Sequence, residues 1–188
     1  MENKKIELIK NILISDNIVD SINDYTKVLI EYIPEIKFMI GFDHKHPHHH
    51  LDVWNHTLYA LSISECDFDI RLTLLLHDIG KPFSYQEGEI RHFQGHPKIS
   101  SYISELILNR LGFEKNYINK ICYLIENHDT IISSDDVFDN YDLQLKRFKV
   151  QRCDSLAHHP DQLEKRKDYL NKTKTLLNKG FDCNDNKR

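Results

Sequence analysis

The sequence predicts an all-α protein, a bundle of about seven or eight helices with at most one small β-hairpin. Two observations predict this class. Apolar residues recur every three or four positions through most of the chain, which is the spacing of a buried helix face. Asp, Pro and Gly residues stand where these periodic stretches begin and end. Because no internal repeat or linker interrupts the 188 residues, they are expected to form one domain.

The first half of the chain is expected to hold four helices. Pro34 ends the second helix, Asp52 is the candidate cap of the third, and Asp67 or Asp69 opens the fourth. Gly80 is expected to terminate the fourth helix, whose surface is apolar nearly all round and therefore buried. The expected helices span about residues 6–13, 18–33, 52–64 and 67–79, with a loop at 41–47.

The second half begins with the only β signal. Residues 83–93 place aromatic and β-branched side chains around Glu87-Gly88, a pattern typical of a small hairpin. Pro97 suits the first turn of a helix, and the polar segment 129–140 resembles a mobile loop. The remaining helices are expected at about residues 97–111, 116–128, 141–158 and 160–177. Residues 1–40 then pack on a main domain over 41–178, and residues 179–188 form a polar tail, frayed from about Asn178.

Bulk composition excludes several classes of protein. The net charge is −4 without a basic block, so there is no electrostatic case for duplex nucleic-acid binding. No apolar stretch approaches the roughly 20 residues that span a bilayer, and the N-terminus lacks the pattern of a signal peptide. The four cysteines stand far apart, which favours reduced thiols and a cytoplasmic location: Cys66, Cys122, Cys153 and Cys183. The oligomeric state stays open.

Histidine and aspartate residues fall on faces that should point inward. His56 shares a helix face with Val53 and Ala60, and Asp154 shares one with Val150 and Ala157. The pair His77-Asp78 ends the buried helix, where an ionised carboxylate is costly without compensation.

Nitrogen and carboxylate donors without thiolates suit a catalytic site for Fe, Mn, Mg, Co or Zn. With His96 and His128 added, the chain offers ligands for one or two divalent ions, with Asp78 bridging them. Lys81 is placed to neutralise charge on a substrate phosphate.

The order of these residues resembles the HD superfamily of metal-dependent phosphohydrolases, whose core pattern is a His, an adjacent His-Asp and a distal Asp. Three segments are similar to the HD domain of bacterial tRNA nucleotidyltransferases: residues 48–57, 76–82 and 92–96. The resemblance covers roughly residues 44–170, so residues 41–178 are expected to be an HD metal-binding domain. The nucleotidyltransferase head is not found in these 188 residues, so a stand-alone HD protein is expected and CCA addition is not implied.

The resemblance also implies roles. Four residues would bind the first metal (His56, His77, Asp78, Asp154) and three the second (Asp78, His96, His128). Asp78 and Lys81 are the expected catalytic residues. Lys81 and Arg147 are expected to contact phosphate, Arg147 because it lies two turns before Asp154. The histidines of residues 44–50 are either a solvated loop or a substrate-binding mouth, with His50 as the candidate. His158 and His159 are expected only to end a helix.

Together these features predict a phosphomonoesterase or phosphodiesterase that acts on a nucleotide or other small phosphate ester through metal-activated hydroxide. A related alternative is a dinuclear-iron oxygenase of the HD type, which would take up dioxygen and release no phosphate. A third reading is a non-catalytic, metal-stabilised module that binds a nucleotide without turnover. The expected partner is therefore a small phosphorylated molecule, with no membrane involved.

Overall fold

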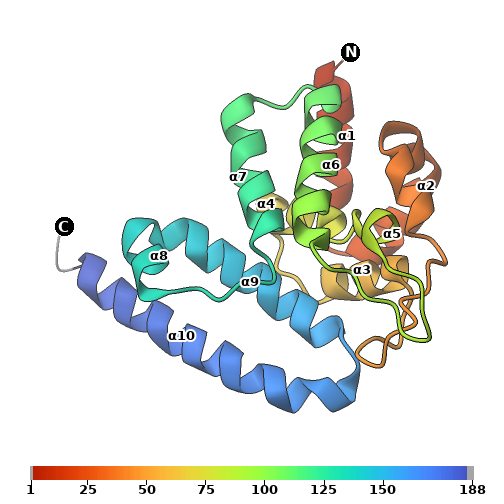
Figure 1. Ribbon diagram of the computed structural model, residues 1–188. Coiled ribbons are helices and arrows are strands. Elements are labelled where there is room, and N and C mark those ends of the chain that lie inside the picture. Colours follow the sequence, from red (N-terminus) through yellow and green to blue (C-terminus); the bar gives the residue numbers. More distant parts are fainter. Residues whose placement is uncertain (1, 186–188) are drawn as a thin grey trace.

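The computed structural model describes residues 2–185 and is built from helices (Figure 1). The all-α prediction is confirmed. The α-helices are α1 (Glu2–Leu13), α2 (Ile18–Tyr32), α3 (Val53–Ser62), α4 (Phe68–Leu76), α5 (Lys81–Ser84), α6 (His96–Leu111), α7 (Lys115–Glu126), α8 (Ser134–Asp139), α9 (Tyr141–Ala157) and α10 (Leu163–Asp185). Two 3-10 helices join them, η1 (Pro34–Phe38) and η2 (Pro160–Gln162). None of the helices within residues 2–185 is both long and apolar enough to cross a bilayer.

Helix α4 is the centre of the bundle. Residues 70–76 are all buried, and the helix contacts α1, α3, α6, α7 and α9. Helices α1, α6 and α7 stand beside one another, whereas α9 and α10 run across the other end of the molecule (Figure 1). Arg71 of α4 donates hydrogen bonds to the carbonyls of Leu13 and Ser15, which satisfies the otherwise unpaired end of α1. The central helix therefore fixes the elements around it and ends where the candidate ligands begin.

Helix boundaries follow the local signals. Asp52 accepts a hydrogen bond from the Asn55 amide at 2.8 Å, and Asp67 accepts one from Ile70 at 3.1 Å. Each carboxylate caps the first turn of the helix that follows it. Gly112 ends α6 with φ +88°, a conformation that glycine adopts without strain. The caps at Asp52 and Asp67 were predicted, with Asp69 as the alternative to Asp67.

Three predictions about local structure are wrong. Residues 83–93 form no hairpin, since only an isolated bridge joins Gln86 to His92, and Tyr85 and Phe93 pack on the ring of Phe42 instead. The segment 129–140 contains helix α8, because Ser133 and Asp136 form a capping box that starts it. Helix α10 continues through Asp185, although residues 178–185 were expected to fray; residues 186–188 lie outside the described part.

A second, smaller apolar cluster holds α8 and α10 against α9. It is formed by Ile132, Val137, Phe148 and Leu177. A Cβ atom on Gly180 would lie 2.5 Å from Val137 Cγ1, so glycine permits the close approach of the two helices. Helix α10 therefore lies along α9 (Figure 1) and carries its first turns toward the end of α9, where Asp154 lies. The cysteines with described side chains, Cys66, Cys122 and Cys153, are free, and the side chain of Cys183 lies outside the described residues.

Candidate metal centre

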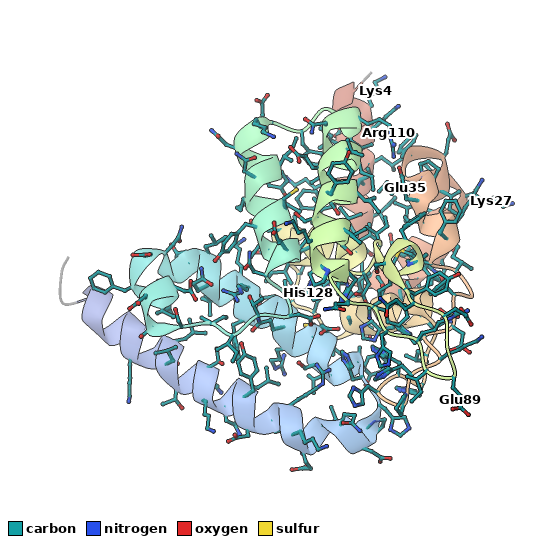
Figure 2. All side chains as sticks on the ribbon, viewed as in Figure 1. Lys4, Lys27, Glu35, Glu89, Arg110 and His128 are labelled. Carbon is teal, nitrogen blue, oxygen red and sulfur yellow. The ribbon has the colours of Figure 1, made fainter. Side chains whose placement is uncertain are left out.

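Four histidines are held in one orientation by backbone carbonyls. Nδ1 of His56 donates to Ala157 O, and Nδ1 of His77 donates to Leu74 O. His96 and His128 do the same toward the carbonyls three residues before them, at 3.0 and 2.6 Å. Because a carbonyl only accepts, each Nδ1 must carry a hydrogen, so Nε2 is the nitrogen of each ring that remains to bind an ion. Figure 2 places His128 below the end of α7, near the middle of the molecule.

The first group joins α3, the turn after α4, and α9. His56 Nε2 lies 2.9 Å from Asp154 Oδ1 and 3.7 Å from Asp78 Oδ2. His77 Nε2 lies 3.3 Å from Asp78 Oδ2 and 3.5 Å from Asp154 Oδ1. One ligand atom from each of the four residues lies within 4.8 Å of all the others. Ligand atoms that each lie about 2.0–2.2 Å from one shared ion would be separated from one another by distances like those measured here.

The second group shares Asp78 but uses its other oxygen. Oδ1 of Asp78 lies 3.2 Å from His96 Nε2 and 3.9 Å from His128 Nε2. These three ligand atoms also lie within 4.8 Å of one another. Asp129, at the rim, lies 3.4 Å from His96 Nε2. The structure thus brings all six expected metal ligands together as two adjoining groups that meet at the carboxylate of Asp78.

Gly80 brings the helix that carries His96 close to the turn after α4. Its amide donates to the Ser100 hydroxyl at 2.9 Å, and a Cβ atom there would lie 2.5 Å from the Ser100 amide nitrogen. The sequence predicted that Gly80 terminates a helix, but α4 already ends at Leu76. The residue instead allows the first turn of α6 to pack on the turn that holds Asp78.

The ligand atoms have an electrostatic need for a cation. Within residues 2–185, His77 Nε2 and Asp78 Oδ1 are buried without a hydrogen bond, which is costly for polar atoms, whereas Asp78 Oδ2 is paired with the Lys81 ammonium at 2.7 Å. Burial would lower the pKa of His77, but Asp78 and Asp154 outweigh it and raise the pKa to about 10. Burial would raise the pKa of Asp78, yet His77 and Lys81 hold it well below its usual value. The residues present therefore fit a bound metal ion.

The part of the chain that matches known proteins contains all six of these residues. The model of the HD domain family matches residues 48–170. This chain belongs to the HD domain family. Over 106 residues it is 33% identical to the CC-adding tRNA nucleotidyltransferase of Thermus thermophilus, covering 52% of this chain and 24% of that relative. Over 123 residues it is 30% identical to the A-adding tRNA nucleotidyltransferase of Deinococcus radiodurans, covering 61% and 26%.

The matched region spans about a quarter of the length of these curated relatives. The predicted resemblance to the HD domain of tRNA nucleotidyltransferases is therefore confirmed. In this HD domain, four of the six ligand residues line a pocket of about 210 Å³: Asp78, His96, His128 and Asp154. Ammonium, guanidinium and imidazole side chains from several segments also line this pocket, which we call the basic pocket: Lys81, Arg91, Arg166, His46, His48, His49, His92 and His158.

Two expected phosphate contacts lie away from this pocket. Arg147 is 2% exposed, and its guanidinium donates to the backbone carbonyls of Asn127, Thr130 and Ile131 and to the Gln144 side chain. It holds the 127–131 segment on α9 and is not among the residues that line the pocket. His50 is exposed, and its ring packs edge-on to that of His159.

Other basic residues that sequence reasoning missed do line the pocket. Arg166 of α10 reaches it, and its guanidinium donates a long 3.4 Å hydrogen bond to the Ser155 hydroxyl. Nothing in the local sequence marked it, because its approach to the pocket depends on how α10 packs back along α9. His158 is buried, with Nδ1 2.8 Å from the Asp154 carbonyl. Its position four residues after Asp154 was the signal that could have identified it.

The 44–50 segment divides into buried and exposed histidines. His44 is 1% exposed and stacks on His49 with ring centroids 3.7 Å apart. His49 in turn lies against His158, at 4.4 Å between ring centroids. The amide of His159 donates to the His48 carbonyl at 2.8 Å, so the segment is tied to the end of α9. His46, His48 and His49 of this segment line the pocket, whereas His50 does not.

Proposed function

We propose that this HD domain is a metal-dependent phosphohydrolase that acts on a nucleotide or another small phosphate ester. One observation carries the proposal: two ligand groups share Asp78 through its separate oxygens, beneath a pocket lined with basic side chains. Metal ligands favour a site for a Lewis acid, and the basic lining favours an anionic substrate. Hydrolysis of a phosphate ester uses both.

The proposed metal ligands are the two groups described above. His56, His77, Asp78 and Asp154 would hold one divalent ion, and Asp78, His96 and His128 a second. Bound there, divalent ions would polarise a phosphoryl oxygen and lower the pKa of water toward about 7. Nitrogen and oxygen donors without sulfur are compatible with Fe, Mn, Mg, Co or Zn.

The chain's own cations would bind and orient the phosphate. The Lys81 ammonium is directed at the centre by Asp78, 2.7 Å away, and offsets the charge of that buried carboxylate. Arg166 presents a planar guanidinium with donors to spare, which suits two oxygens of one phosphate. Asp129, a partly exposed carboxylate at the rim, is placed to exchange a proton with the leaving oxygen.

The relatives support the substrate class. Both are named as enzymes that add nucleotides to tRNA, so nucleotide chemistry surrounds this HD domain in those proteins. We infer from this that a nucleotide, or the end of an RNA chain, is the first substrate to test.

A metal analysis and a phosphate-release panel test the proposal. Anaerobically purified protein should contain divalent metal. In a panel of mono-, cyclic and dinucleotides it should release phosphate from a monoester or hydrolyse a diester bond. Asp78→Ala should lose both ions and at least about 100-fold in turnover, because Asp78 serves both groups. Asp161→Ala, an exposed acid outside the ligand set, is the control.

Asp78→Asn, which keeps the size of the side chain, separates loss of metal from loss of fold when circular dichroism is recorded for each variant. Hydrolysis by Asp78→Ala at the parent rate would contradict the proposal. Dioxygen uptake by iron-loaded protein without phosphate release would contradict it as well.

A further inference from the structure

A second cavity adjoins the metal centre on the side of α10. It has a volume of about 330 Å³, which falls at the lower end of the range for small-molecule sites, about 300–1,000 Å³. It shares His128, Asp129, Asp154 and Arg166 with the basic pocket, so the two cavities meet at the ligands. We call this second cavity the α10 pocket. The inference drawn from it depends on the proposed function, because it concerns the remainder of the same substrate.

Most polar groups in the wall of the α10 pocket are already satisfied by the protein. The Gln151 amide donates to the carbonyls of Asn127 and Thr130, and its oxygen accepts from the Tyr169 hydroxyl at 2.6 Å. The same hydroxyl lies 3.4 Å from the amide of Ile132. These bonds fix the 127–132 segment between α9 and α10. They leave the ring of Tyr169, rather than its hydroxyl, available to a ligand.

Two further observations give the pocket its chemistry. Ile131 lines the α10 pocket and is 76% exposed. Such exposure is unusual for a large aliphatic side chain whose own segment is fixed by hydrogen bonds. Lys165 and Arg166, adjacent on the first turns of α10, also line it; within the described residues neither takes part in an ion pair. An aliphatic surface and an aromatic ring therefore lie beside two cations and open onto the metal ligands.

The two cavities differ in what they would accept. The basic pocket presents imidazoles, ammonium and guanidinium groups, which suit phosphate oxygens. The α10 pocket adds Ile131 and Tyr169, which suit the face of a flat ring, because such rings stack on aromatic and apolar side chains. An ester that spans both would have its phosphate at the ligands and its organic group under α10.

We propose that the α10 pocket is the subsite for the organic group of the phosphate ester, and that this group is a flat ring system such as a nucleobase. Ile131 and Tyr169 supply the apolar contacts, and Arg166 holds the phosphate at the junction of the two cavities. Sugar phosphates and short alkyl phosphates would then bind through their phosphate alone.

Binding of two phosphonates to Mn²⁺-loaded protein, measured by calorimetry, tests this. One is the phosphonate analogue of adenosine 5′-monophosphate and the other is the matching ribose phosphonate without a base; their P–C bonds resist hydrolysis. The parent protein should bind the nucleoside phosphonate at least about fivefold more tightly, as expected for one stacked base. Ile131→Ala should reduce that preference at least about threefold, whereas Ile131→Leu should keep it. Ile40→Ala, another exposed isoleucine that lies outside both pockets, should also keep it.

Equal binding of the two phosphonates, binding of neither, or a preference that survives Ile131→Ala would overturn the inference. The measurement needs no turnover, so its failure differs from failure of the proposed function. Hydrolysis of nucleotides without a base preference contradicts only the α10 pocket. A base preference without phosphate release from any ester contradicts only the hydrolase.

Discussion

The Lys81 ammonium lies 3.1 Å from Nε2 of His44, on the wall of the basic pocket. His44 Nδ1 donates to the Leu51 carbonyl at 2.9 Å, so its Nε2 is the acceptor for Lys81. Burial, and then the charge of Lys81, lower the pKa of His44 to about 2, which keeps its ring neutral. A neutral imidazole thus holds the ammonium 2.7 Å from Asp78 Oδ2. The lysine is fixed in position before any substrate arrives.

Replacement of Lys81 should impair turnover more than folding. In metal-loaded Lys81→Met we expect kcat/KM for phosphate esters to fall about 100-fold, because a preorganised charge at the reacting phosphate is lost. Steady-state kinetics and metal content, measured on the same sample, check this. Lys98→Met removes an exposed lysine from the first turn of α6 and should keep the parent rate. Parent-like turnover in Lys81→Met would remove the lysine from the mechanism.

The two arginines near Asp154 should behave oppositely. Arg147→Met leaves several carbonyls of the 127–131 segment without a donor, so the free energy of unfolding should fall by about 3 kcal/mol. Arg166→Met removes a guanidinium that makes one long protein hydrogen bond, so stability should stay within about 0.5 kcal/mol. Its KM for phosphate esters should rise about tenfold through loss of a charged contact.

Urea denaturation and steady-state kinetics separate these two effects. Arg152→Met, which replaces an exposed arginine of α9, is the control for both measurements. If Arg147→Met were as stable as the parent but raised KM, the arginine would be a substrate contact after all, as its spacing from Asp154 first indicated.

Close packing at Gly80 should be essential to the second ligand group. In Gly80→Ala the new methyl group meets the Ser100 backbone, which cannot swing away as a side chain would. We expect a loss of about 1–3 kcal/mol in the free energy of unfolding and weaker binding of one of two metal ions, because α6 carries His96. Thermal denaturation and metal titration check both effects. Gly88→Ala lies in an exposed bend, where the new Cβ atom would be 3.2 Å from the Ile90 carbonyl oxygen; it should affect stability less than Gly80→Ala and leave metal binding unchanged.

Residues that act within one helix or one turn were readable from the sequence. The caps at Asp52 and Asp67, the Pro97 start of α6 and the inward face of His56 all depend on spacing along a single element. The six candidate ligands were identified because each stands on such an inward face or at such an end, and the structure brings them together. Local spacing therefore predicted most helices and the residues of the candidate metal centre.

Residues whose role depends on distant elements were not readable. Arg166 reaches the pocket only because α10 packs back along α9, and His44 is buried only because its loop folds over Lys81. Arg147 has the spacing of a substrate contact, but the 127–131 carbonyls take its donors. Each of these contacts joins residues from different elements, so tertiary packing rather than local spacing determines the role of the residue.

The acid Asp69, remote from the metal centre, should make stability depend on pH. It accepts hydrogen bonds from Tyr117, Lys120 and Lys146 at 2.6–2.9 Å, which tie α4 to α7 and α9. Burial would raise its pKa, but the bonds from Lys120 and Lys146 outweigh burial and lower it. Because the folded pKa lies below the unfolded value of about 3.9, the stabilisation is complete above that pH. It is lost as the pH falls through the folded pKa.

Asp69→Asn should therefore lower the free energy of unfolding by about 2 kcal/mol at pH 7, through loss of the charge-assisted bonds. The difference from the parent should shrink as the pH falls below about 4, where the parent's carboxylate becomes protonated. Urea denaturation between pH 3 and pH 7 measures it. Asp24→Asn, an exposed acid on α2, should match the parent throughout. A difference between Asp69→Asn and the parent that stays constant with pH would mean that size or packing, not charge, accounts for the role of Asp69.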